Sequence, residues 1–249
     1  MQTVGAPLPK ATLKPPNPNG YVLLAAVVDA WPAPLPPSRR KRALLRNMKR
    51  SIAELRQLAD IQAANVFQAL LRPPGEGTAL LRRAGIKPAR YDVVVLIRTT
   101  DLVAAENLLD DRRFGRLVNE LTANARGDVY RIVADNVRRI EDVPETSREV
   151  FLFNYFYADD PRELIPVWEY TAGWFMANAH LLNSTVLRPV HPGPYGIVNH
   201  ASWPHLWTFL PHLILRRSFR RYVLGNFAAN GIAAQPIVYR RLSPARPDL

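Results

Sequence analysis

The chain carries the same sequence pattern twice, about 105 residues apart. Residues 108–118 read LLDDRRFGRLV and residues 213–223 read LILRRSFRRYV, so that Phe114 aligns with Phe219. Each segment follows a short apolar run, at 91–100 and at 195–202. Repetition at a fixed period indicates a duplicated structural unit whose copies bury apolar surface against each other. We therefore expect two similar units within one chain.

Each unit reads as a strand, a helix, two strands, a helix and a strand. Apolar runs flanked by proline, glycine and helix-capping residues mark these elements. This is the order of the split βαβ, or ferredoxin-like, unit. In the first unit we expect strands at 21–31, 65–72, 91–100 and 128–135, and helices at 39–60 and 102–125. In the second we expect strands at 150–157, 181–190, 195–202 and 234–242, and helices at 160–178 and 203–225.

The strands are apolar on both faces, which limits how the two units can pack. The helices of a ferredoxin-like unit cover one face of its sheet, so the other face also needs a cover. The simplest cover is the sheet of the other unit, which gives an α+β, single-chain pseudo-dimeric α/β barrel with helices outside and a pocket inside. The expected division is a flexible proline-rich lead-in (1–20), a first repeat (21–138), a linker (139–149), a second repeat with the pocket (150–242) and a tail (243–249).

Composition excludes several classes of protein and site. The chain has no cysteine, which excludes disulfides and zinc–thiolate sites. It has no run of 18 apolar residues and no apolar leader, so we expect no membrane span and a cytoplasmic location. The net charge of +12 is spread over both halves, without the motifs of a nucleic-acid-binding module. These features argue against nucleic-acid binding, and we expect some of the arginines to bind an anionic small molecule.

The second half resembles the dimeric α/β-barrel superfamily, which includes antibiotic-biosynthesis monooxygenases, haem-degrading monooxygenases and chlorite-dismutase-like proteins. Asn154 interrupts the apolar strand VFLFNYFY at the place where these monooxygenases carry a functional asparagine. The segment LRPVHPGPYGIVNHAS resembles their hairpin, with Ala201 at the position of their tryptophan and Trp203 two residues later. The resemblance implies the barrel fold, oxidation of an aromatic or polyketide-like substrate and, as a possible further partner, a second copy in a homodimer.

Candidate site residues are concentrated in the second unit, where all five histidines lie between 180 and 212. A buried Asn154 carboxamide can hold a phenol or carbonyl oxygen, and His200 can accept a proton near neutral pH. A structural role for each remains open at this stage: a satisfied amide for Asn154, and a core histidine for His200. As substrate-binding residues we predict Arg98 as an anion partner, Asn199 beside His200, and the apolar walls Tyr157, Trp168, Trp174 and Trp203.

The resemblance, taken together with these residues, implies two enzymatic or cofactor-binding functions, and a third function of another class remains open. The first is a cofactor-independent monooxygenase or related tailoring enzyme with Asn154 and His200 as catalytic residues and no metal. The second is a haem protein of the same superfamily, with His200 or His205 as the axial ligand and arginines at the propionates. The third is a non-catalytic barrel that binds a small molecule. No Walker loop, G-x-S-x-G elbow or H-E-x-x-H motif supports another chemistry.

Overall fold

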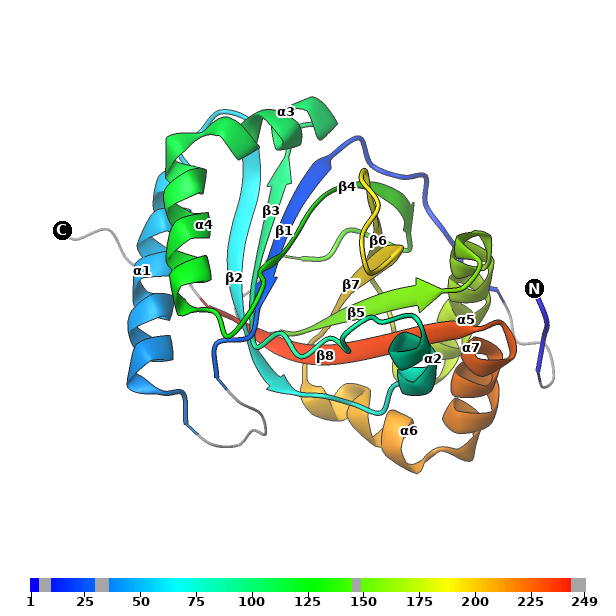
Figure 1. Ribbon diagram of the computed structural model, residues 1–249. Helices are drawn as coiled ribbons and strands as arrows, with labels where there is room; N and C mark the ends of the chain where they lie inside the picture. Colours follow the sequence, from blue (N-terminus) through cyan, green and yellow to red (C-terminus); the bar gives the residue numbers. More distant parts are fainter. Residues whose placement is uncertain (5–9, 30–35, 145–148, 243–249) are drawn as a thin grey trace.

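The computed structural model describes residues 1–4, 10–29, 36–144 and 149–242, which form an eight-stranded closed barrel with helices outside it (Figure 1). The first unit contributes β1 (Gly20–Ala26), β2 (Ile61–Leu71), β3 (Val93–Thr99) and β4 (Tyr130–Arg139). The second contributes β5 (Val150–Ala158), β6 (Ser184–Pro189), β7 (Ile197–Trp203) and β8 (Ile232–Leu242). The predicted fold class, a pseudo-dimeric α/β barrel of two ferredoxin-like units, is confirmed.

The order around the barrel is β1-β3-β2-β8-β5-β7-β6-β4, with all neighbours antiparallel. Within each unit the four strands therefore lie side by side in the ferredoxin-like order: the fourth strand, then the first, the third and the second. Two seams join the units: β2 pairs with β8, and β4 pairs with β6. Both seams contain a register shift, and at Asn136 the side-chain amide donates to the carbonyls of Arg138 (2.7 Å) and Val186 (3.0 Å). That amide satisfies backbone acceptors which the irregular pairing leaves open.

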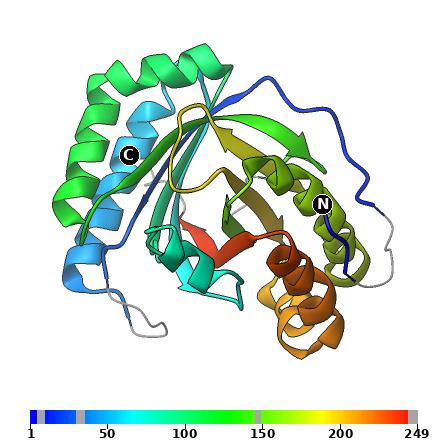
Figure 2. The ribbon, with the colours of Figure 1, turned by 45° about the vertical axis from the view of Figure 1, so that its right-hand side comes forward.

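Helices cover the outer face of each half, as Figures 1 and 2 show from two sides. On the first half lie α1 (Arg39–Leu55), α3 (Leu102–Asn107), η1 (Leu108–Asp110) and α4 (Arg112–Asn124), with the short α2 (Thr78–Arg83) near the second half. On the second half lie η2 (Pro161–Glu163), α5 (Leu164–Ala179), η3 (Leu206–Thr208), α6 (Leu210–Leu215), the π-helical η4 (Phe219–Leu224) and α7 (Gly225–Ala229). Among the described residues, none of these helices has the length and apolar character needed to cross a bilayer.

Local sequence accounts for where the helices begin. Ser38 caps α1 by accepting a hydrogen bond from the Lys41 amide (3.0 Å), and Asp101 caps α3 in the same way. The expected helix at 203–225 is divided into η3, α6, η4 and α7, and Pro211 lies in the first turn of α6, where its missing N–H costs no helical hydrogen bond. The expected helix at 102–125 is likewise broken, where Asp111 caps a new helix, α4.

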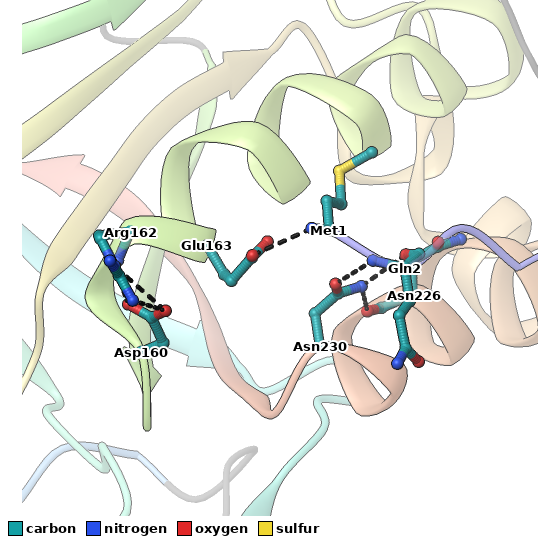
Figure 3. A network of polar contacts seen from close by, with 7 residues as sticks. All are labelled: Met1, Gln2, Asp160, Arg162, Glu163, Asn226 and Asn230. Carbon is teal, nitrogen blue, oxygen red and sulfur yellow. Dashed lines mark hydrogen bonds and ion pairs between the residues drawn. The ribbon is translucent and has the colours of Figure 1, made fainter.

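The described part of the proline-rich lead-in lies against the barrel instead of extending freely. Asn17 bonds to the Asn136 and Asp142 side chains, and Lys14 forms a β-bridge with Arg139. At the start of the chain, Asn226 of α7 and Asn230 at its C-terminal end each bond both the N–H and the C=O of one residue, Val4 and Gln2 respectively. Figure 3 shows Gln2 beside Asn230. Polar side chains of the barrel and of the α7 end therefore hold the described parts of this segment in place.

A buried ion pair ties α1 to the sheet. Lys41 Nζ lies 2.7 Å from Asp92 Oδ2, and both side chains are almost fully buried. Asp92 also accepts hydrogen bonds from the backbone amides of Val28 (2.6 Å) and Asp29 (2.9 Å), which fixes the chain just after β1. The pair thus joins three segments that are distant in sequence.

Removing one partner of this pair should destabilise the fold strongly. Lys41→Met leaves the Asp92 carboxylate buried without its counter-ion, which costs about 3–5 kcal/mol. We expect urea unfolding to show that loss, and the Lys41→Met/Asp92→Asn double variant to recover part of it. The half-buried Lys49→Met on the same helix is the control. A loss for Lys41→Met no larger than that of the control would contradict the assignment.

Candidate functional site

One end of the barrel opens into a cleft of about 910 Å³. Its walls come from the segment 85–91 before β3, the segment 126–133 at the start of β4, and the loop 191–195 between β6 and β7. Both units therefore contribute to it. A volume of this size accommodates a drug-sized molecule, and such a cleft is the default binding site of a protein.

Three tyrosines form the inner wall of the cleft. Tyr91 and Tyr130 stack with ring centroids 5.6 Å apart and planes within 11°. Tyr195 meets Tyr130 edge to face at 5.5 Å and an interplanar angle of 90°. Tyr155, from β5, closes the wall behind them, 5.2 Å from Tyr91. Flat aromatic faces with fixed orientation favour an aromatic ligand.

The Tyr130 hydroxyl is buried and, within the described part of the chain, has no hydrogen-bond partner. Buried polar groups are normally paired, because an unpaired one costs free energy. Tyr130 lines the cleft, but its hydroxyl has almost no exposed surface, so a ligand oxygen meets it only when the ring shifts toward the cleft. Burial raises the pKa of the Tyr130 phenol far above its ordinary value and that of Tyr91 to about 12. Both phenols therefore stay protonated and can donate hydrogen bonds to an anionic oxygen.

Positive charge surrounds the mouth of the cleft. Lys87, Arg126 and Arg131 line it and are exposed, with Asp128 and His191 also on the rim. The Arg126 Nε donates to the Val28 carbonyl at 3.0 Å, which holds this side chain against the end of β1. The excess of cations over the single carboxylate favours an anionic ligand.

Tyrosine hydroxyls also hold the loops that shape the cleft. The Tyr195 hydroxyl donates to the Lys87 carbonyl (2.9 Å), and the Tyr239 hydroxyl donates to the Tyr91 carbonyl (2.8 Å). Tyr239 lies on β8, so the second unit anchors a loop of the first. The cleft walls are therefore fixed before any ligand arrives.

The predicted residues Arg98, His200 and Tyr157 belong to strand faces that turn into the barrel. Arg98 and His200 line a small cavity of about 30 Å³ at the end opposite the cleft, large enough for about one water molecule. The His200 ring stacks on Phe153 at 4.3 Å and is almost fully buried. Tyr157 lies at the cleft end of β5, where its hydroxyl bonds Asp159 Oδ1 at 3.2 Å.

The other predicted residues lie outside the barrel wall, between the second sheet and its helices. Asn154 and Asn199 are direct cross-strand partners on β5 and β7. The apolar cluster around them contains the remaining predicted residues, Trp168, Trp174 and Trp203. The structure thus separates this group from His200 and Arg98, which we had expected in the same pocket. The reason is strand alternation: neighbouring residues such as Asn199 and His200 point to opposite faces.

The tryptophans of this outer layer have structural partners. Trp203 Nε1 donates to the Ala179 carbonyl at 2.7 Å, and its ring stacks on Phe209 at 4.3 Å. Trp174 Nε1 donates to Ser218 Oγ at 3.2 Å. These bonds connect α5 to β7 and to the start of η4, so both tryptophans contribute to packing.

The two asparagines have no counterpart in the first unit. Tyr21 pairs with Arg98 as Phe153 pairs with His200, so Val22 and Ile97 occupy the positions of Asn154 and Asn199. Asn199 Oδ1 accepts a hydrogen bond from Ser184 Oγ at 2.6 Å. The Asn154 Oδ1 is buried and, among the described residues, unpartnered. A polar pair has therefore replaced an apolar pair in the second unit only.

Sequence reasoning missed the tyrosines of the cleft. Tyr91, Tyr130 and Tyr195 each stand at or just before the first residue of a strand, and two of them open the apolar runs that we quoted. Their shared position at strand starts was the one sequence signal that could have pointed to them. Which end of the barrel stays open depends on loop packing, and the hydrophobic periodicity of the strands does not indicate it. His205 is exposed at the start of η3, away from the cleft.

Comparison with solved structures supports the fold. An anthrone oxidase-like protein matches with a TM-score of 0.64 over 92% of this chain and 95% of its own, at 8% sequence identity. A candidate monooxygenase from Fusobacterium nucleatum subsp. nucleatum has a TM-score of 0.54 over 91% and 93%, at 10% identity. A candidate chlorite dismutase has a TM-score of 0.52 over 91% and 95%, at 11% identity. Neither a protein-family model nor a curated protein matches the sequence.

The buried His200 should make stability depend on pH. Burial, with the nearby positive charge of Arg98, lowers the pKa of His200 from 6.5 to about 3. The unfolded chain then binds a proton at a higher pH than the folded chain. We expect the contribution of neutral His200 to the free energy of unfolding to be complete above about pH 6.5. Below that pH it should fall by about 1.4 kcal/mol per pH unit toward pH 3.

Urea unfolding at a series of pH values tests this dependence. His200→Phe keeps an aromatic ring beside Phe153 and should flatten the slope between pH 6.5 and 3. Phe153→Leu is the control, because it loosens the same cluster without removing a titratable group; it should lower stability and keep the slope. An unchanged slope in His200→Phe would show that other groups cause the acid sensitivity.

Proposed function

We propose that this protein is a cofactor-independent oxygenase, or a closely related tailoring enzyme, that binds an aromatic anionic molecule in the tyrosine-lined cleft. The observation that carries the proposal is Tyr130, which lines the 910 Å³ cleft and whose buried hydroxyl has no hydrogen-bond partner in the part of the chain that the structure describes. Stacked Tyr91 and Tyr130 rings suit a flat polycyclic substrate. The likeness in fold to an anthrone oxidase-like protein agrees with a substrate of that kind.

In this mechanism the cleft stabilises charge on a substrate oxygen. A substrate whose CH₂ group is conjugated through the ring system with a carbonyl, as in anthrone, loses a proton from that CH₂ to form an enolate. Tyr130 donates a hydrogen bond to the enolate oxygen, and Arg126 or Lys87 lowers the energy of its negative charge. The carbanion then reduces O₂, so that the CH₂ group and O₂ become a carbonyl group and water. Asp128 and His191 are the cleft residues able to accept the first proton.

The buried setting favours this chemistry. The tyrosine wall excludes water from the reacting face of the substrate, which strengthens each hydrogen bond to the enolate. The rigid walls also orient the ring for attack by oxygen. A non-catalytic binding barrel would use the same stacking and charge, but would bind the molecule without consuming oxygen.

Haem does not fit at the residues that we predicted as its ligands. His200 borders a cavity of about 30 Å³ and stacks on Phe153, so its ring has no room for a porphyrin. His205 lies exposed on η3, outside the barrel. The proposed reaction therefore involves no haem-dependent step.

The outer layer around Asn154 is the second candidate site for the same reaction. What favours it is the Asn154 Oδ1, which no described residue bonds, together with the apolar Val22 at the equivalent position of the first unit. There Asn154 would hold the substrate oxygen between the sheet and the helices, with Asn199 beside it. Because the two sites lie on opposite sides of the barrel wall, variants separate them.

Replacing the cleft hydroxyl should weaken binding and turnover. For Tyr130→Phe we expect binding of anthraquinone-2-sulfonate, followed by calorimetry, to fall about tenfold, because one hydrogen bond to a charged oxygen is lost. Oxygen uptake with anthrone should fall at least as far. Tyr21→Phe, at the other end of the barrel, is the matched control. Equal behaviour of the two variants would remove the cleft from the proposal.

The Asn154→Ala variant tests the second site. If the reaction takes place in the cleft, Asn154→Ala should keep oxygen uptake with anthrone within about twofold of the parent protein. A loss of at least tenfold, with circular dichroism and thermal unfolding unchanged, would move the reaction to the outer layer. Binding of anthraquinone-2-sulfonate without any oxygen uptake would instead identify a binding protein.

A further inference from the structure

One outer surface combines exposed apolar and basic side chains in an unusual way. The Trp207 and Leu215 side chains are each 77% exposed, and that of Ile214 is 47% exposed. Arg216, Arg217, Arg220 and Arg221 follow and are also exposed. We call these seven residues the basic–apolar surface. It lies on η3, α6 and η4, at the lower edge of the molecule in Figures 1 and 2.

The exposed apolar residues of this surface are distinct from the residues that pack the same segment onto the core. The same segment buries Phe209, Leu213 and Phe219, and its contact with β7 is made by the Phe209–Trp203 stack. Arg216 donates to Asn178 Oδ1 at 2.6 Å, which fixes the turn between α6 and η4 against the end of α5. The segment is therefore anchored on its inner side, and Trp207, Ile214 and Leu215 face away from that anchor. Soluble monomers rarely expose large apolar residues in a cluster unless they bind something.

The sequence around this surface lacks negative charge altogether. Glu169 is followed by no aspartate or glutamate until Asp248, whereas eight arginines lie between them. The segment itself therefore offers no carboxylate to pair with its arginines. A cluster of this kind attracts an extended anionic surface, and each arginine adds to the attraction.

We propose that the basic–apolar surface docks on an anionic lipid bilayer. Tryptophan and aliphatic side chains inserted among the headgroups, with arginines beside them at the lipid phosphates, are the pattern of an interfacial anchor. Nucleic acid accounts for the arginines and for Trp207, but Ile214 and Leu215 have no base to stack on. A symmetric contact with a second copy would bring two sets of four arginines together without a carboxylate from either segment.

The proposed surface is separate from the cleft. It begins directly after the end of β7 at Trp203, whereas Tyr195, before the start of β7, lines the cleft. The two features thus lie at opposite ends of one strand. Membrane docking and cleft binding can consequently be tested independently of each other.

Co-sedimentation with vesicles tests the proposal. We expect the full-length protein to bind vesicles of phosphatidylserine and phosphatidylcholine in equal parts, and to remain in solution with phosphatidylcholine alone. Trp207→Ser/Leu215→Ser should weaken binding at least tenfold. Arg220→Gln/Arg221→Gln should weaken it about fivefold for each arginine removed, and added salt should weaken it further.

Controls come from the opposite half of the molecule. Val103→Ser replaces a side chain that is 64% exposed on α3, and Arg42→Gln/Arg46→Gln removes two exposed arginines from α1. Both should bind the mixed vesicles like the parent. All variants should keep their thermal unfolding and their binding of anthraquinone-2-sulfonate.

Three results would overturn the proposal. The first is no binding to the mixed vesicles. The second is equal loss of binding in the test and control variants, which would indicate attraction by overall charge. The third is binding of an oligonucleotide, or self-association seen by analytical ultracentrifugation, that depends on Trp207 and Leu215 while vesicles are not bound.

Discussion

The two seams between the repeats are the constraint on which the rest of the structure depends. Neither four-stranded sheet can leave its inner face in water, since residues such as Phe67, Leu96, Phe153 and Tyr239 are buried there. Pairing of β2 with β8 and of β4 with β6 removes all four sheet edges at once. It also places a strand of each unit next to loops of the other, as the bond from Tyr239 to the Tyr91 carbonyl illustrates.

The inside of the barrel is filled unevenly, and this creates the cleft. Phe67 meets Phe151 and Phe153 edge to face, each at 5.1 Å, and with His200 they form an aromatic layer that leaves little space at one end. At the other end the packed interior side chains stop at the wall formed by Tyr91, Tyr130 and Tyr195, and the cleft lies beyond that wall. Tyrosine suits that boundary because its ring packs on the layer behind it, while a hydroxyl such as that of Tyr195 or Tyr239 bonds the carbonyl of a loop. A filled floor and an open mouth therefore come from one continuous set of aromatic residues.

The fold followed from the sequence because duplication and strand polarity are both visible in it. Apolar residues at both parities, as in YVLLAAVV and VFLFNYFY, require cover on two faces, and a second copy of the unit provides it. The candidate site was harder to predict from the sequence than the fold. Asn154 and His200 stand out as polar residues in apolar strands, yet the sequence alone does not say which strand face meets the other unit. The tyrosines of the cleft stand at strand starts, where the pattern is weakest, and loops from three parts of the chain bring them together.

The contact between α7 and the first residues of the chain has a consequence for sequence tolerance. Asn226 and Asn230 are one helical turn apart, with a rise of about 6.0 Å, close to the rise of about 6.6 Å between alternate residues of an extended chain. Each side-chain amide therefore bonds one backbone N–H and one C=O, at Val4 and at Gln2, as the edge strand of a sheet would. Only backbone is recognised in these bonds. Other residues at positions 2 and 4 can therefore make the same bonds, and the first residues of the chain stay in place. Replacing Asn226 or Asn230 removes the side-chain amide that bonds them.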